Sequence, residues 1–480
     1  MALTRSPPSP SRQLTCGRPR ATAITIALSV LLGGCASWQP TATAEPGLPI
    51  PPTWSESGVP TPGALVATPS SLAQWWHHFN DPLLTTLVTQ ALQANTSVRT
   101  AQAALQQSRA LRDAKGAALL PGVKASTSAQ RNQTDARDAT TSFRVGLDAS
   151  WEPDVFGGQR NARDATEADA QAAQAALGDV QVSIAAEVAL AYIQLRGQQN
   201  QWHIARTNLA SQQETLQITD WRTQAGLATA LEVEQARAAS EQTGAQLPVL
   251  HANIAKTRHS LAVLTGQSPG ALEALLAPMA AIPQAAHDLA LSIPAQTLRQ
   301  RPDVRAAEHR ISAALARVSA ADAARYPSFS ISGSLGLSAL TLGALTNGAS
   351  VLNALLASIS VPLFDGGAGI AQVQAQEAGL EQARVGYQAA VLSALKDVED
   401  ALVALAGDRA RLLRLQNAAD AAANAALLAQ QRYASGLIDF QTVLQTQRTL
   451  LTAQDNVASS QADISADHVR LYKALGGGWY

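Results

Sequence analysis

Cys35 is the residue whose surroundings most clearly specify a chemical reaction. It follows Leu31-Leu32-Gly33-Gly34, at the end of an apolar run that starts at Ala21 and is itself preceded by four arginines. A basic segment, an apolar stretch and small residues before a cleavage point are typical of a secretory signal. Small residues directly before a cysteine resemble a bacterial lipobox, in which cleavage leaves the cysteine as an acylated N-terminus. We therefore predict a lipoprotein signal peptide over residues 1–34 and lipidation of Cys35. The alternative is an ordinary signal with an incidental cysteine.

The other reactive side chains form no catalytic or metal-binding pattern. His77 and His78 are neighbours, so on a helix they point about 100° apart, and no third ligand lies near them. The acidic residues in the range 397–400 lack a partner base. His468 is isolated on a predicted helix and is expected at the surface. We expect no enzyme activity, no metal and no cofactor.

The composition excludes several classes of function. The chain has 480 residues, of which 15% are charged and 4% aromatic, with a formal net charge of −1. Loss of residues 1–34 would remove four arginines and leave 31 basic and 36 acidic residues, a net charge of −5. Neither charge favours a nucleic-acid partner. Two cysteines cannot build a disulfide framework. Residues 35–71 are rich in Pro, Thr and Ser, which predicts an extended tether behind the lipid.

Four segments alternate apolar and small or polar residues as membrane β-strands do. Ser142–Glu152 and Ser328–Leu337 are the clearest, Val123–Ala129 is weaker, and residues 358–363 form the fourth. No apolar stretch beyond residue 35 suggests a membrane-spanning helix. The alternative is a pair of amphipathic hairpins in a soluble sandwich. Because four strands cannot close a barrel and open edges leave unpaired amides in lipid, several chains would have to share their strands. Three chains would supply twelve.

The sequence repeats itself with a period near 210 residues. Gly226-Leu227 recurs as Gly436-Leu437, and the positions upstream of the strands recur with an offset of 206. Two proline-free stretches, each about 67 residues and so about 100 Å long as helices, occupy equivalent places in the two halves. Apolar residues in both stretches follow heptad spacing, which favours coiled-coil packing. Gly226 and Gly436 then end these helices, and shorter helices return.

These patterns predict a mainly α protein with membrane β-strands, built as a tandem duplication. The first repeat covers 72–268 and holds a helix, a strand pair at 122–152, a long helix at 159–225 and a return helix. A connecting segment covers 269–294. The second repeat covers 295–480, with its strand pair at 328–364 and its long helix at 368–435. Long helices of this kind, with alanine at many intervening positions, could pack side by side as staves.

Several motifs resemble the outer-membrane efflux channels of the TolC type, in their lipoprotein, NodT-like branch. These motifs are the lipobox ending in Cys35, Trp75–Leu83, Arg301–Glu308, Pro362–Gly367, and Arg432-Tyr433 followed by Gly436-Leu437. The resemblance extends from about Trp75 to Gly477 and implies a homotrimer in the outer membrane. In that trimer the strands would form a twelve-stranded barrel, and the long helices would form a periplasmic α-barrel. It also implies that an adaptor protein docks at the glycine turns, around Gly226, Leu227, Gly436 and Leu437.

In such channels, residues just past the turns close the aperture. By resemblance, Tyr433 and Arg448 match tethering residues, and Glu232 matches an acid of the first turn. Thr442 and Gln445 stand where family members often carry aspartate. The available carboxylates are therefore Glu232, Glu234 and Asp439. We expect a closed resting aperture with a weak cation-attracting ring.

The resemblance implies a passive exit channel of a tripartite efflux system, lipid-anchored in the cell outer membrane and extending into the periplasm. Its partners would be outer-membrane lipid, a periplasmic adaptor and an inner-membrane pump of the RND class, with the MFS and ABC classes as alternatives. Drugs and other small molecules would be its cargo. Two other hypotheses remain: a structural coiled-coil lipoprotein without a pore, and the exit duct of a type I protein-secretion system.

Overall fold

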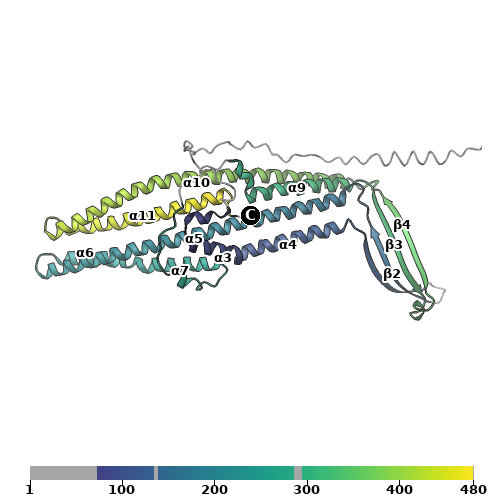
Figure 1. Cartoon of the computed structure of the whole chain (residues 1–480), viewed down its shortest axis with the longest axis horizontal. Coiled ribbons are helices and arrows are strands. Elements are labelled where there is room, and N and C mark those ends of the chain that lie inside the picture. The colour runs from purple at the N-terminus through teal and green to yellow at the C-terminus, as the bar shows by residue number, and fades with distance from the viewer. Residues whose placement is uncertain (1–72, 134–138, 286–294, 479–480) are drawn as a thin grey trace, which may run out of the picture. The chain divides into compact units, whose positions relative to one another are not determined.

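The computed structural model describes residues 73–133, 139–285 and 295–478. All of them belong to one compact unit, Pro46–Tyr480 (Figure 1). Cys35, the signal peptide and the tether predicted over 35–71 lie outside the described residues.

Each half of the duplication contributes short helices, a strand pair, a long helix and a return. The first half consists of η1 (Trp75–Phe79), α3 (Pro82–Ala94), α4 (Thr96–Ala117), β1 (Gly122–Asn132), β2 (Thr140–Trp151), α5 (Gly158–Gln224), α6 (Ala230–Gly244), α7 (Gln246–Leu264) and α8 (Glu273–Leu276). The second half consists of η3 (Ala295–Gln300), α9 (Pro302–Ala323), β3 (Ser328–Ala339), η4 (Gly343–Leu345), β4 (Ser350–Ser360), α10 (Ala368–Ala434) and α11 (Phe440–Ala474).

The long helices α5 and α10 each contain 67 residues, as the proline-free stretches predicted. Glycines with left-handed backbone angles precede both: Gly157 has a φ of 79° and Gly367 a φ of 90°. Apolar residues at heptad spacing on α10, among them Val391, Val398 and Leu405, are buried. The helices are therefore held by a packed seam, in agreement with the coiled-coil expectation.

The sequence analysis found no apolar stretch beyond residue 35 that suggested a membrane-spanning helix, and this expectation was wrong for α5. An 18-residue window of α5 reaches a mean hydropathy of 1.4, so this helix is long and apolar enough to cross a membrane by length and composition. Half of that window is buried inside the protein. The high hydropathy comes from the alanine-rich centre of a helix that packs against several others, and such core helices pass the same test.

The helices lie side by side in a fixed order. In the half nearer the strands, α4 packs on α5, α5 on α9, and α9 on α10. Toward the other end, α7 and α6 pack on α5, α5 on α11, and α11 on α10 (Figure 1). The helices α9 and α11 thus follow one another in the space between the two long helices. This order leaves α10 on one side, and α4 with α7 on the other, as the edges of the layer.

The strands form one antiparallel sheet in the order β1-β2-β3-β4. The two halves join where β2 pairs with β3, for example Val145 opposite Leu337. The strands β1 and β4 are the edges. The fourth strand begins earlier than its alternating residues suggested: β4 covers Ser350–Ser360, and Pro362, which has no backbone N–H to donate, lies beyond its end. The sequence pattern failed because Leu352, Leu355 and Leu356 place apolar residues on both faces of β4.

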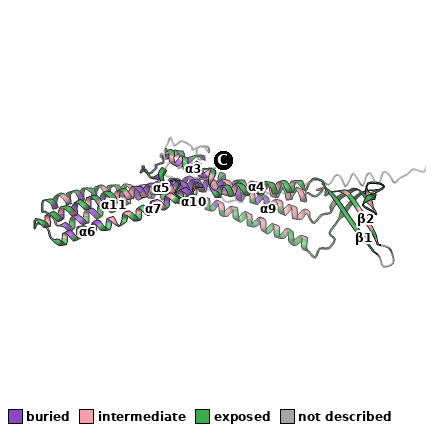
Figure 2. Cartoon of the chain, turned by 90° about the horizontal axis from the view of Figure 1, so that it is seen from below, coloured by how far each residue is buried: buried purple, intermediate pink, exposed green. Residues whose placement is uncertain are grey.

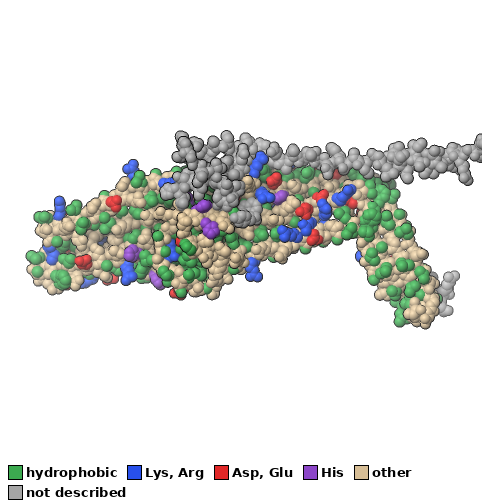
Figure 3. All heavy atoms as spheres, viewed as in Figure 1, with side chains coloured by type: hydrophobic (Ala, Val, Ile, Leu, Met, Phe, Trp, Pro, Cys, Tyr) green, Lys and Arg blue, Asp and Glu red, His purple; other side chains and the backbone are tan. Residues whose placement is uncertain are grey.

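Figure 3 shows mainly apolar and uncharged polar side chains on the visible face of these strands, whereas charged side chains are spread over the helices. The exposed apolar residues of the strands include Val145, Leu335, Val351, Leu355 and Ile359. A surface of this kind fits a hydrocarbon environment better than water.

The largest buried cluster surrounds the middle of the helices (Figure 2). Here η1 and α3 cover α5, and the end of α11 covers η1. The Trp75 ring stacks on Tyr472 with centroids 5.5 Å apart and an angle of 11° between the planes. This aromatic contact joins the beginning of the described chain to its last helix.

Candidate functional site

Both long helices end in the same hydrogen-bonded turn, at the end of the unit away from the strands (Figure 1). The Leu227 N–H donates to the Arg222 carbonyl at 2.8 Å, and the Leu437 N–H donates to the Arg432 carbonyl at 2.9 Å. Such turns require a left-handed residue, and Gly226 and Gly436 supply it with φ values of 74° and 71°. The glycines therefore end the helices for the predicted reason.

The residues after these glycines are presented to solvent. Leu227 is 70% exposed and Leu437 is 73% exposed. Each of the two turns thus presents one exposed leucine at the end of the helices. Lone exposed leucines are ordinary, but a pair at the tip of two helix hairpins suits a contact with another protein.

Two of the predicted gate acids cap helices. Glu232 and Thr229 form a capping box at the start of α6: the Glu232 N–H donates to the Thr229 hydroxyl at 3.3 Å, and the Thr229 N–H donates to the Glu232 carboxylate at 3.1 Å. Asp439 caps α11, where the N–H and hydroxyl of Thr442 donate to its carboxylate at 2.8 and 2.7 Å. These two hydrogen bonds lower the pKa of Asp439, which is therefore a fixed negative charge.

The other gate candidates make few contacts within one chain. Glu234 pairs with Arg237 at 2.7 Å, and both side chains are more than half exposed. Gln445 and Arg448 are exposed, and within the described part of the chain the Arg448 guanidinium forms no ion pair. The structure thus brings Glu232 near Tyr433 and joins Asp439 to Thr442, but it does not bring Arg448 to Tyr433.

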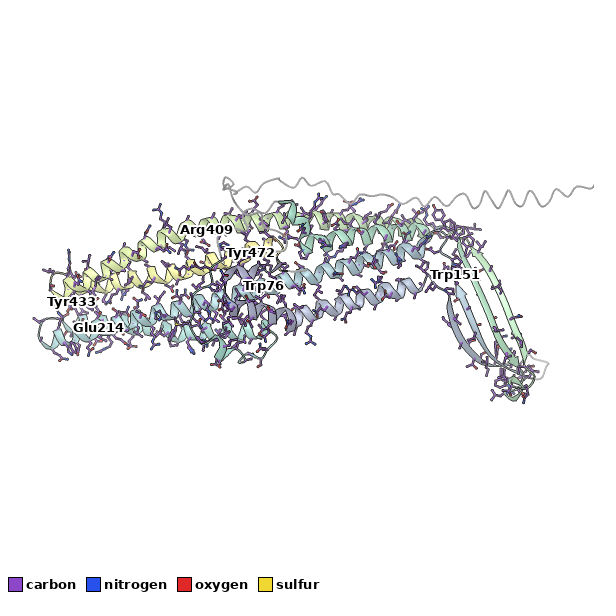
Figure 4. All side chains as sticks on the ribbon, in the orientation of Figure 1. Trp76, Trp151, Glu214, Arg409, Tyr433 and Tyr472 are labelled. Carbon is purple, nitrogen blue, oxygen red and sulfur yellow. The ribbon has the colours of Figure 1, made fainter. Side chains whose placement is uncertain are left out.

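Tyr433 lies in a buried cluster that joins the two turns (Figure 4). Its ring centroid is 5.3 Å from that of Phe440, the first residue of α11. The guanidinium carbon of Arg222 lies 4.6 Å from the centroid of the Tyr433 ring. Arg222 Nη1 also donates to the backbone carbonyls of Tyr433 and Ala434 at 3.1 and 3.4 Å. The end of α5 is therefore bonded directly to the end of α10.

The surroundings of Tyr433 keep its hydroxyl protonated. Burial raises the pKa of Tyr433, and the negative charge of Glu232 raises it further. The tyrosine can therefore serve as a neutral hydrogen-bond donor when the tip rearranges.

Sequence reasoning missed Arg222 as a member of this site. The repeat gave a hint, because Arg222 is the equivalent of Arg432, the neighbour of Tyr433. The two arginines behave differently: Arg222 contacts the other hairpin, whereas Arg432 is exposed. Only the packing of α5 beside α10 distinguishes them.

No group of three or more His, Cys, Asp or Glu side chains that could hold a metal ion occurs among residues 73–133, 139–285 and 295–478. The tip has charged helix caps, a buried aromatic cluster, and Arg222, which joins the two hairpins. This arrangement can hold two helix hairpins together and release them.

Comparisons with known proteins agree with this geometry. The model of the family described as "Outer membrane efflux protein" matches residues 87–267 and 293–477. The toluene efflux pump outer membrane protein TtgF of Pseudomonas putida is 30% identical over 469 residues, covering 95% of this chain and 96% of that protein. Nodulation protein T of Rhizobium leguminosarum bv. viciae is 29% identical, covering 91% and 89%. The solved outer-membrane channel OprN is 33% identical, with a TM-score of 0.81 over 90% of this chain and 99% of that chain.

Proposed function

The chain belongs to the outer membrane efflux protein family, and from this membership we propose how it builds an exit duct. It is the outer-membrane component of an efflux pump, and channels of this kind are trimers that work with an adaptor and an inner-membrane pump. The proposal concerns how the copies close on one another, what docks at the tip and what anchors the chain.

The proposal rests on the edges of the sheet and of the helical layer, because in both layers the two edges come from different halves of the chain. In both, the first half of the chain supplies one edge and the second half the other: β1 and β4 in the sheet, α4 with α7 and α10 in the helices. A copy can therefore join its second-half edge to the first-half edge of the next copy. Contacts between two different edges generate rings when the rotation closes, and three copies give twelve strands.

Exposed apolar residues support the same closure. On α10, Val385, Leu392, Leu413 and Leu427 are more than half exposed and are separated by multiples of seven residues, so they share one face of the helix. On the opposite edge, Val249 and Val263 of α7 are 14 residues apart and each is 59% exposed. A second coiled-coil seam between copies would bury both stripes.

At the tip, we expect a periplasmic adaptor to bind the turns at Leu227 and Leu437. The pump behind it would be of the RND class, with the MFS and ABC classes as alternatives. The relative TtgF is named for toluene efflux, which supports small organic molecules as cargo here. Cys35 would carry the lipid. Ala73 lies 38 positions after Cys35, so an extended tether could reach about 120 Å.

A single substitution tests the closure. Leu413→Asp would place a charge in the proposed seam, so the purified protein should lose its SDS-resistant trimer and its conductance in planar bilayers. Leu227→Asp changes another exposed leucine, which lies away from the seam, and it should leave the trimer intact. A monomeric wild-type rod that conducts no ions would instead support a structural spacer. An unchanged Leu413→Asp trimer would reject the proposed seam.

A further inference from the structure

The chain returns from the tip along α6 and α7 in the first half and along α11 in the second. Equivalent hydrogen bonds hold the last turn, or base, of each return. In the first half, Asn95 Nδ2 donates to the Leu264 carbonyl at 2.8 Å. In the second half, Arg301 Nη1 donates to the Ala474 carbonyl at 2.5 Å. These residues are related by the offsets of the duplication, 206 for the donors and 210 for the acceptors. In both halves, the residue before a helix that runs to the strands holds the last turn of a helix that comes from the tip.

We call these two hydrogen bonds, from Asn95 and from Arg301, the two clasps. They differ in what else the donor side chain binds. Asn95 is neutral and its oxygen caps α4 by accepting the N–H groups of Ser97 and Val98. Arg301 Nη2 instead pairs with Asp303 at 2.7 Å and with Asp397 of α10 at 3.3 Å. The Arg301 side chain is only 9% exposed. The second clasp therefore joins α9, α10 and α11 through one buried guanidinium.

The charge on Arg301 is secure. Burial lowers the pKa of Arg301, but hydrogen bonds and charge from Asp303 and Asp397 outweigh it, and the net pKa is raised. Arg301 faces a cleft of about 430 Å³, which is also lined by Asp179, Asp467 and Lys473. The base of α11 thus has open space beside it, and the arginine lines that space.

The helices behind the two clasps differ in continuity. The helix α11 runs unbroken for 35 residues, from Phe440 in the tip cluster to Ala474 in the clasp. In the first half, α6 ends at Gly244 and α7 begins at Gln246, so the return is interrupted. A rod of 35 residues is about 52 Å long, and a rotation of about 5° at its base moves the far end by about 4.5 Å. The broken return can absorb such a rotation at the interruption.

We propose that Arg301 is a positioning residue for the tip, because it fixes the base about which α11 swings when Phe440 leaves Tyr433. Loss of the clasp releases that base into the adjoining cleft and shifts the tip toward its open arrangement. Asn95 holds an equivalent base, but the break before α7 separates it from the tip. The inference rests on the proposed gated duct and adds the residue that sets the rest position of its moving helix.

Single-channel recordings of purified trimers in planar bilayers test the proposal. Arg301→Ala should raise the open probability at least about fivefold, in the range of ordinary coupling between distant sites. Arg301→Lys should lie between Arg301→Ala and wild type, because an ammonium can bind the Ala474 carbonyl or a carboxylate but not all three partners at once. Asn95→Ala, the matched control, should stay within about twofold of wild type. Equal effects of Arg301→Ala and Asn95→Ala would overturn the proposal.

A second measurement needs no pore. A spin label on Leu437→Cys reports distances between the tips of a trimer in lipid. Those distances should increase and broaden with Arg301→Ala and stay unchanged with Asn95→Ala. If Arg301→Ala fails to assemble, Asp397→Asn removes only the α10 partner and should shift the distances in the same direction by less. Tip distances equal to wild type in both variants would reject the role of Arg301. If the tip distances change in Arg301→Ala but no trimer conducts ions, the proposed duct is rejected and the role of Arg301 at the base of α11 is retained.

Discussion

The two halves of this chain share a backbone plan but hold it together with different chemistry. Both end their long helices at a left-handed glycine, and both hold the base of the return with a side chain before the next helix. The first half uses a neutral asparagine and a broken return. The second uses a buried guanidinium and an unbroken helix of 35 residues. The duplication preserved geometry, whereas the chemistry that resists or permits movement diverged.

The tip shows the same asymmetry. Arg222 of the first half reaches across to Tyr433, while its equivalent Arg432 is exposed. The second hairpin is therefore held at both ends by arginine: Arg222 at the tip and Arg301 at the base. If the α10–α11 hairpin moves as proposed, contacts at both of its ends must break.

The glycines beside the two clasps offer the largest expected effect. Gly266 and Gly476 have φ values of 73° and 76°. A Cβ on Gly266 would lie 2.7 Å from the Ala94 carbonyl oxygen, and a Cβ on Gly476 would lie 2.7 Å from Arg301 Cγ. Gly266→Ala should destabilise the protein by about 3 kcal/mol, because backbone must move as well as adopt a strained φ. The midpoint of thermal dissociation of the trimer measures this.

Gly476→Ala should cost about 2 kcal/mol, since its shortest contact is with a side-chain carbon that can yield more easily than a carbonyl, while the Arg301 Cα would lie 3.1 Å away. It should also displace Arg301 and so shift the tip, which Gly266→Ala should not do. If the two alanines lowered the midpoint equally and neither altered conductance, the functional difference between the clasps would be lost.

The tip arginines give the next largest difference. Arg222→Ala removes two hydrogen bonds to backbone carbonyls and the contact with the Tyr433 ring, which should weaken the tip by about 1–3 kcal/mol. Chymotrypsin, which cuts after aromatic residues, should then cleave faster at Tyr433 and Phe440. Arg432→Ala is the control and should leave the cleavage rate unchanged. Similar rates for the two variants would show that the asymmetry at the tip has no energetic meaning.

Much of the architecture could be predicted from the sequence, because it depends on periodic features. Heptad apolar residues, proline-free stretches and paired glycines identified α5, α10 and both turns. Glu232 and Asp439 were recognised as carboxylates near the tip, yet their capping roles depend on hydrogen bonds to Thr229 and Thr442.

The contacts between distant segments could not be predicted. Arg301 was recognised as part of a family motif, but its bonds to Asp397 and Ala474 join positions that lie 96 and 173 residues away. His468 was expected at the surface and is buried, since α10 covers that face of α11. Periodicity reports which residues share a face, and it does not report which helix covers that face.

A buried acid makes the second half sensitive to pH at a position where the first half has no titrating side chain. Asp467 of α11 is 1% exposed, and burial together with the neighbouring Asp408 carboxyl raises the pKa of Asp467 to about 6, even though Arg470 pairs with it at 2.5 Å. Its first-half equivalent is Thr257, which cannot titrate.

A raised carboxyl pKa means that the folded protein binds this proton more tightly than the unfolded chain does. The Asp467 contribution therefore stabilises at low pH and is lost as pH rises from about 4 to about 6, by up to about 3 kcal/mol per chain. Asp467→Asn should reduce the difference in thermal midpoint between pH 4.5 and pH 7.5. Asp463→Asn, at a half-buried position on the same helix where the carboxylate lies 3.9 Å from Arg411 Nη1, should leave that difference as in wild type. An unchanged difference in Asp467→Asn would place the pH response elsewhere.

The smallest expected effect comes from a pair of helical glycines, and it bears on how the halves meet their neighbours. A Cβ on Gly197 of α5 would lie 3.2 Å from the Ala462 Cβ of α11, while its equivalent Gly407 of α10 has open space within the chain. Gly197→Ala should therefore separate α5 from α11 slightly and lower the thermal midpoint.

Gly407→Ala meets nothing in its own chain and should stabilise the helix by up to about 1 kcal/mol. That gain requires the space beside Gly407 to remain open in the trimer. Because α10 is the edge proposed to meet the next copy, a loss of stability in Gly407→Ala would show that a neighbouring copy fills the space. A gain would show that Gly407 faces away from the seam, and would leave the stripe of Val385, Leu392, Leu413 and Leu427 as the contact.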